Sequence, residues 1–181
     1  MNVQEYLERE YREIREFRSL LTSESDRGCA LFACAYLDKK LSDLLHRALA
    51  VDKNIDQELF QGNAPLATFS SRIKLAYYLG KLSKAEKHDL NLIKRIRNKF
   101  AHSAQPITFE TPEINNRCKE LSFSYHKRSG SGRQHFTASC LGLHAHLVTA
   151  TLSCEAPETK PDNAPTEEKK DVHRRLLAKI Q

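Results

Sequence analysis

The stretch from Gly28 to Leu37, which reads GCALFACAYL, constrains the fold more than any other part of the sequence. A helix of these residues is apolar on nearly every side, and only a helix surrounded by others tolerates such a composition. We therefore expect it to lie in the middle of a helical bundle. The predicted core residues are Cys29, Leu31, Phe32, Ala33, Leu37, Ile93, Ile96 and Phe100.

Start and stop signals divide the rest of the chain into further helices. Ser83 and Glu86 have the spacing of a capping box, and Thr111 followed by Pro112 is typical of a helix start. Gly80 predicts the end of a helix that begins at Thr68 or Ser70. The other predicted segments are an amphipathic helix over about 3–21, a short helix or turn over 52–59, a basic loop over 126–133 and a core helix over 136–154. The sequence thus predicts an all-α bundle of six or seven helices.

The polar end of the chain predicts a division into two parts. Residues 155–170 contain three prolines and many charges, a composition that cannot bury enough apolar surface to order itself. We expect a single helical domain over 1–154, and a disordered polar linker and basic tail over 155–181. A marginal basic helix over 171–181 is compatible with this expectation.

Several classes of protein are disfavoured by composition. No apolar run approaches the ~20 residues of a membrane span, and the charged segment 1–21 lacks the apolar centre of a signal peptide. These features predict a cytoplasmic protein without membrane contact. No two of the five cysteines are separated by two residues, as metal ligands often are, and His144 and His146 lie on different sides of a helix. We expect no metal and no cofactor.

The segment from Leu90 to His102 carries the clearest chemical motif. Asn98 and His102 share a helical face opposite the apolar one, with Arg97 near the border. Arg97, Asn98 and His102 resemble the short motif of HEPN-type helical domains, many of which cut RNA. Arginine offers a charged fork to a phosphate oxygen, and histidine can transfer a proton near neutral pH. An outward-facing Asn98/His102 pair also predicts a second subunit on that face, and hence a homodimer.

Charged residues outside this motif suggest two kinds of contact. Asp26, Arg27, Arg72 and Asp89 are charges on otherwise apolar helices, so we expect them to pair, as a binding or structural polar cluster near Arg97. The alternative is ordinary surface charge, which suits Asp26 and Asp89 best. The net charge of +6 is concentrated in short basic runs, which can attract a nucleic-acid backbone.

Several blocks together resemble the mannitol-operon-repressor (MtlR/MltR) family. They are 25–31, 35–38, 60–66 (FQGNAPL), 69–76 and 89–102, in the family's order, over about residues 20–123. The resemblance implies an all-helical bundle without a helix-turn-helix reader, and a regulatory protein. The chain departs from the family's pattern after about Ser124.

The resemblance and the motif lead to different functions. The first predicts a transcriptional repressor or corepressor that acts through protein or nucleic-acid contacts. The alternative is a metal-independent HEPN-type ribonuclease or toxin that uses Arg97 and His102. A protein-interaction scaffold is a third possibility.

Overall fold

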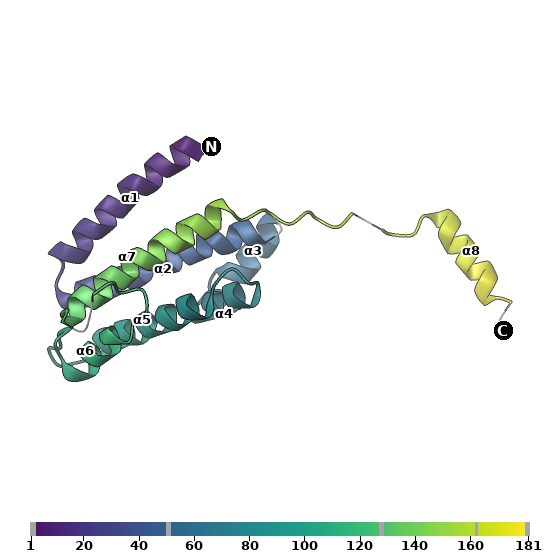
Figure 1. Cartoon of the computed structure of the whole chain (residues 1–181). Helices are drawn as coiled ribbons and strands as arrows, with labels where there is room; N and C mark the ends of the chain where they lie inside the picture. The colour runs from purple at the N-terminus through teal and green to yellow at the C-terminus, as the bar shows by residue number, and fades with distance from the viewer. Residues whose placement is uncertain (1–2, 50–51, 127–128, 162, 180–181) are drawn as a thin grey trace.

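The computed structural model describes residues 3–49, 52–126, 129–161 and 163–179, which form eight α-helices and no strand (Figure 1). The helices are α1 (Val3–Ser23), α2 (Asp26–Ala48), α3 (Lys53–Phe60), α4 (Phe69–Tyr78), α5 (Lys84–His102), α6 (Pro112–Lys119), α7 (Gly132–Leu152) and α8 (Glu167–Leu177). The predicted all-α class is confirmed. The number of helices exceeds six or seven because both segments that the sequence left marginal, α3 and α8, are helical.

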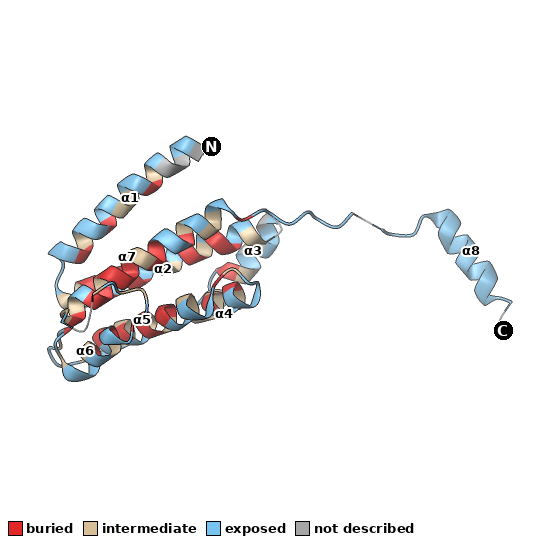
Figure 2. Cartoon of the chain, in the orientation of Figure 1, coloured by how far each residue is buried: buried red, intermediate tan, exposed pale blue. Residues whose placement is uncertain are grey.

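Helix α2 lies at the centre of the bundle, as its apolar composition predicts. It packs against α1, α4, α5 and α7, and Figure 2 shows many buried positions along it. Cys29, Ala33 and Leu37 of α2 are fully buried. From α5, the predicted core residues Ile93, Ile96 and Phe100 are buried as well.

Two predicted core residues of α2 are not buried, which corrects the sequence prediction. Leu31 is 37% exposed and Phe32 is 36% exposed, and Ala35 beside them is also exposed. The neighbouring helices do not close completely around α2, so one apolar strip of it faces outward. Composition shows that a helix is apolar all round, but not how many neighbours it has.

Local signals place most helix boundaries correctly. Ser83 and Glu86 form the predicted capping box of α5, and Gly80 has a positive φ of 68° after α4. Helix α7, however, begins at Gly132 rather than Phe136, so part of the predicted basic loop is helical. A second capping box, between Ser131 and Gln134, causes this early start.

An aromatic stack and a buried ion-pair network attach helix α1 to α2. The rings of Phe17 and Tyr36 are stacked with centroids 4.0 Å apart. Lys40 of α2, which is 4% exposed, pairs with Glu10 and Glu13 of α1.

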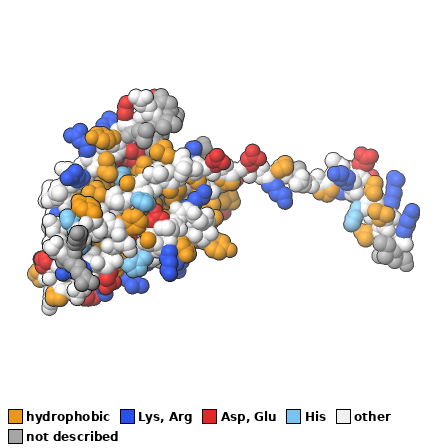
Figure 3. Space-filling model, in the orientation of Figure 1, with side chains coloured by type: hydrophobic (Ala, Val, Ile, Leu, Met, Phe, Trp, Pro, Cys, Tyr) orange, Lys and Arg blue, Asp and Glu red, His pale blue; other side chains and the backbone are white. Residues whose placement is uncertain are grey.

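The end of the chain stands away from the bundle (Figure 3). Helix α8 has no buried residue and packs against no other described helix. It begins at Glu167, four residues before the predicted basic helix. The disorder of 155–181 and the division at 154 remain predictions. In the part of the chain that the structure describes, no helix is both long and apolar enough to cross a membrane.

Candidate functional site

The outward face of α5 carries a stripe of polar side chains. Arg95, Asn98, Lys99 and His102 follow the i, i+3, i+4, i+7 spacing that places residues on one helical face. The opposite face is buried in the core, so packing fixes the rotation of α5 and leaves this stripe in solvent. The sequence predicted this outward direction for Asn98 and His102.

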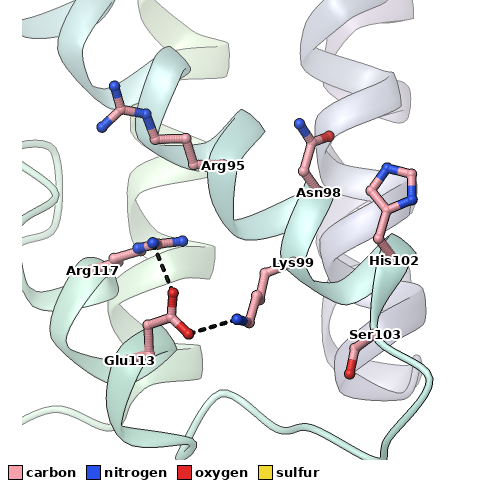
Figure 4. Close-up of a pocket in the computed structure, with 7 residues that line it drawn as sticks. All are labelled: Arg95, Asn98, Lys99, His102, Ser103, Glu113 and Arg117. Carbon is pink, nitrogen blue, oxygen red and sulfur yellow. Dashed lines mark hydrogen bonds and ion pairs between the residues drawn. The ribbon is translucent and has the colours of Figure 1, made fainter.

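An open hollow of about 480 Å³ lies over this stripe, between α5 and α6. Figure 4 shows that Lys99 of α5 and Arg117 of α6 point toward Glu113, which lies in the first turn of α6. The residues that line the hollow are Arg95, Asn98, Lys99, His102, Ser103, Glu113 and Arg117.

Glu113 is held by two cations, one on each oxygen. Its Oε2 lies 2.8 Å from Nζ of Lys99, and its Oε1 lies 2.8 Å from an Nη of Arg117. The hydrogen bond from Lys99, followed by the charges of Lys99 and Arg117, lowers the pKa of Glu113 below its usual value. This carboxylate is therefore ionised at neutral pH, and it partly neutralises the two cations.

The other polar side chains of the stripe lack such partners. No hydrogen bond or ion pair joins Arg95, Asn98 or His102 to another side chain among the described residues. In Figure 4, Asn98 and His102 project away from Glu113, whereas Arg95 lies on the same side of α5 as Arg117. Arg95 and Lys99 therefore border the side of the stripe that faces α6, whereas Asn98 and His102 lie on the side away from Glu113.

Arg97, the third residue of the sequence motif, does not line the hollow. Its side chain lies close to the Cys34 thiol of α2. Burial raises the pKa of the Cys34 thiol, and the Arg97 contact offsets part of that rise. Five residues along an α-helix correspond to a rotation of about 140° between Arg97 and His102. Within one chain, Asn98 and His102 thus share the hollow, while Arg97 faces α2.

The predicted polar cluster is not formed, because each of its charges has a partner of its own. Asp26 pairs with Arg133 at 2.8 Å and also accepts a hydrogen bond from the Phe109 backbone N–H. Arg27 donates to the Ser103 carbonyl oxygen at 2.8 Å. These contacts tie the start of α2 to three distant parts of the chain.

The other two charges lie elsewhere in the bundle. Arg72 pairs with Asp38 at 2.7 Å. Asp89 is fully buried and accepts hydrogen bonds from the backbone N–H groups of Ser122 and Phe123. Each of the four charges has a contact of its own, and each contact joins a different pair of segments.

The sequence placed Arg133 only at the end of the predicted basic loop, whereas the structure gives its side chain several long-range contacts. Besides Asp26, it donates to the carbonyl oxygens of Leu21 and Glu24. These acceptors lie more than a hundred residues away along the chain, so no local pattern indicates them. Gly132 beside it is required by close packing, because a Cβ there would lie 2.3 Å from the Phe109 carbonyl oxygen.

The cysteines and histidines show no arrangement typical of a metal site. All five cysteines are free and buried. His144 is buried and His146 is paired with Glu86 at 3.1 Å, as expected for two residues on different sides of α7. Among the described residues, no group of three or more potential ligands could hold a metal ion.

Comparison with known proteins gives one family and one solved structure. The model of the family described as MtlR, mannitol repressor, matches residues 16–135, which include every residue that lines the hollow. The X-ray structure of the MtlR-HPr complex from Escherichia coli is similar, with a TM-score of 0.65 and 21% sequence identity over 75% of this chain and 98% of that chain. A search among curated proteins finds no significant match.

Proposed function

Because this chain belongs to the mannitol repressor (MtlR) family, we propose that it is a transcriptional regulator that acts through contact with a protein partner. The observation that carries this proposal is the family match over residues 16–135, which contains helices α2 to α6. The similar fold in the solved structure belongs to a complex with HPr, so HPr is the partner that we propose to test first.

The charge distribution supports a protein partner over direct reading of DNA. Arg72, Lys99, Arg117 and Arg133 are each paired with a carboxylate, so the charge of these four side chains is already compensated. On the face shown in Figure 3, Lys and Arg side chains are scattered among acidic ones. Binding to a phosphate backbone requires several uncompensated cations along one track. We therefore propose a corepressor whose DNA contact is supplied by another protein.

Isothermal titration calorimetry of the full chain with HPr from the same organism tests this proposal. We expect saturable binding that is weakened by Asn98→Ala combined with His102→Ala, since Asn98 is partly exposed, His102 is exposed, and neither side chain has a partner among the described residues. The matched control is Arg12→Ala combined with Arg15→Ala, on α1 outside the family match. The proposal of HPr as partner fails if the wild-type chain shows no binding at micromolar concentrations.

We further propose that a second copy of the chain covers the uncovered strip of α2. Arg27 contacts Ser103, and Cys34 contacts Arg97, so this strip lies alongside the last turns of α5. Exposed Leu31 and Phe32 would form an apolar centre, with Asn98 and His102 at its polar edge. Light scattering should show a homodimer that Leu31→Glu dissociates. Tyr78→Glu, at a side chain that is 90% exposed on α4, should leave it intact.

The ribonuclease alternative has less support. The unpartnered Asn98 and His102 are compatible with it, but Arg97 is turned toward Cys34 and would have to leave that contact to reach a phosphate beside His102. A direct assay for RNA cleavage decides between the two functions.

A further inference from the structure

We propose that the α5–α6 side of the hollow binds a single phosphoryl group, and that Glu113 occupies this site in the absence of the ligand. The inference rests on the proposed function only for the source of the phosphoryl group, which would be a small effector or a modified residue of the partner. The binding itself depends on four side chains: Arg95, Lys99, Glu113 and Arg117.

The charges around the hollow match one dianion. Arg95, Lys99 and Arg117 contribute three positive charges and Glu113 contributes one negative charge, which leaves a net charge of two positive. A phosphate monoester carries about −1.5 to −2 at pH 7. A phosphoryl group can therefore neutralise the site, whereas a neutral polyol cannot.

Glu113 is already bound in the way that an oxyanion would be bound. Each of its oxygens accepts from a different cation, at 2.8 Å from Lys99 and 2.8 Å from Arg117. It also lies in the first turn of α6, where the helix dipole favours negative charge. The side chain is about half exposed, so it can swing into solvent and release both cations without disturbing the core.

Arg95 completes the site and distinguishes it from an ordinary surface ion pair. Its guanidinium has no partner among the described residues, and Figure 4 places it on the same side of α5 as Arg117. Two guanidinium forks and one ammonium can together satisfy three phosphoryl oxygens. A ligand with a carboxylate in place of the phosphoryl group would bind less tightly, because it offers only two oxygens and one negative charge.

The surroundings favour one phosphoryl group over a nucleic acid. Glu110 precedes α6 and Glu120 follows it next to Lys119, so a carboxylate lies beyond each end of this helix. A nucleic-acid strand would bring further phosphates toward these carboxylates. The site therefore suits an isolated charge and disfavours a chain of charges.

Nuclear magnetic resonance of the labelled full chain tests the proposal, with inorganic phosphate as the probe at constant ionic strength. The side-chain N–H signals of Arg95 and Arg117 should shift and saturate. Glu113→Gln should increase the affinity about tenfold, since it removes the competing charge, and Arg95→Gln should lower it about tenfold. Glu120→Gln is the matched control, because this exposed carboxylate on the same segment has no ion pair among the described residues, and it should leave the affinity unchanged.

Three further ligands identify the source and the limits of the site. Tighter binding of glycerol 3-phosphate than of a phosphoserine peptide indicates a small effector, and the reverse order indicates a modified partner; either supports the site. Shifts that stay linear, or equal gains from Glu113→Gln and Glu120→Gln, would overturn it. Tighter binding of a single-stranded RNA decamer than of either phosphomonoester would instead assign the surface to nucleic acid. None of these outcomes depends on HPr, so failure of this site and failure of the proposed partner are distinguishable.

Discussion

The Nζ atom of Lys40 in α2 lies 2.6 Å from Oε2 of Glu10 in α1, and both side chains are almost completely buried. Glu13 accepts a second bond from the same nitrogen, also at 2.6 Å. Burial alone would raise the pKa of Glu13, but the Lys40 hydrogen bond and charge lower it overall. The attachment of α1 therefore depends on one buried cation that is compensated by two carboxylates.

Removal of that cation should be costly, because it leaves buried negative charge without compensation. We expect Lys40→Met to lower the free energy of unfolding by about 3–5 kcal/mol, measured by urea denaturation. Lys39→Met, at an adjacent exposed position, should change it by less than about 0.5 kcal/mol. The triple change Lys40→Met, Glu10→Leu and Glu13→Gln should recover most of the loss. Equal effects of Lys39→Met and Lys40→Met would contradict the buried network.

Stability should fall with acid partly because of His144. Burial, followed by the charge of Lys40, lowers the pKa of His144 from 6.5 to about 4. The unfolded chain therefore binds this proton more tightly, and the free energy of unfolding decreases as pH falls from 6.5 toward 4. The contribution is about 1.4 kcal/mol per pH unit within that window. Denaturation curves of His144→Phe should show a shallower dependence on pH, while His173→Phe, on the exposed helix α8, should follow the wild type.

A pair of leucines in α2 tests which face of this helix is buried. Leu37→Ala should destabilise the protein by about 2–5 kcal/mol, because it leaves a cavity among fully packed neighbours. Leu31→Ala should cost about 1 kcal/mol or less, because that side chain is 37% exposed. The comparison is made on the monomeric form at low concentration, since Leu31 lies in the proposed dimer contact. Equal losses would show that α2 is surrounded on all sides.

Deletion of residues 158–181 should leave the fold intact. The deleted segment contains α8, which buries no side chain and contacts no other described helix. Cys154 must be kept, since its carbonyl oxygen accepts a hydrogen bond from Arg47. The melting temperature should change by less than about 2 °C. A larger fall, seen by differential scanning calorimetry, would mean that the tail docks on the bundle.

Purified protein should not cleave single-stranded RNA in the absence of metal, because Arg97 and His102 face different neighbours. His102→Ala should then have no effect on RNA integrity or on folding. Cleavage that leaves a 2′,3′-cyclic phosphate and disappears in both His102→Ala and Arg97→Ala would establish the ribonuclease function instead. Asn91→Ala, at a partly buried position on the same helix, serves as the control.

Much of the fold was determined by the sequence through interactions between near neighbours. The capping box of Ser83 and Glu86, the stop at Gly80 and the start at Pro112 each depend on residues within one turn of the helix end. The outward direction of Asn98 and His102 follows from helical periodicity in the same way. The capping box of Ser131 and Gln134 is just as visible in the sequence, and it predicts the observed start of α7.

Side-chain burial and ion-pair partners that depend on distant segments were decided only by the tertiary structure. No local pattern shows that Leu31 stays exposed, that Lys40 is buried, or that Arg133 pairs with Asp26. The partner of a buried charge depends on which helices pack around it. The cost of desolvating the charge is offset only by groups that this packing brings into contact with it. For the same reason, the motif residue Arg97 faces Cys34 while His102 faces the hollow.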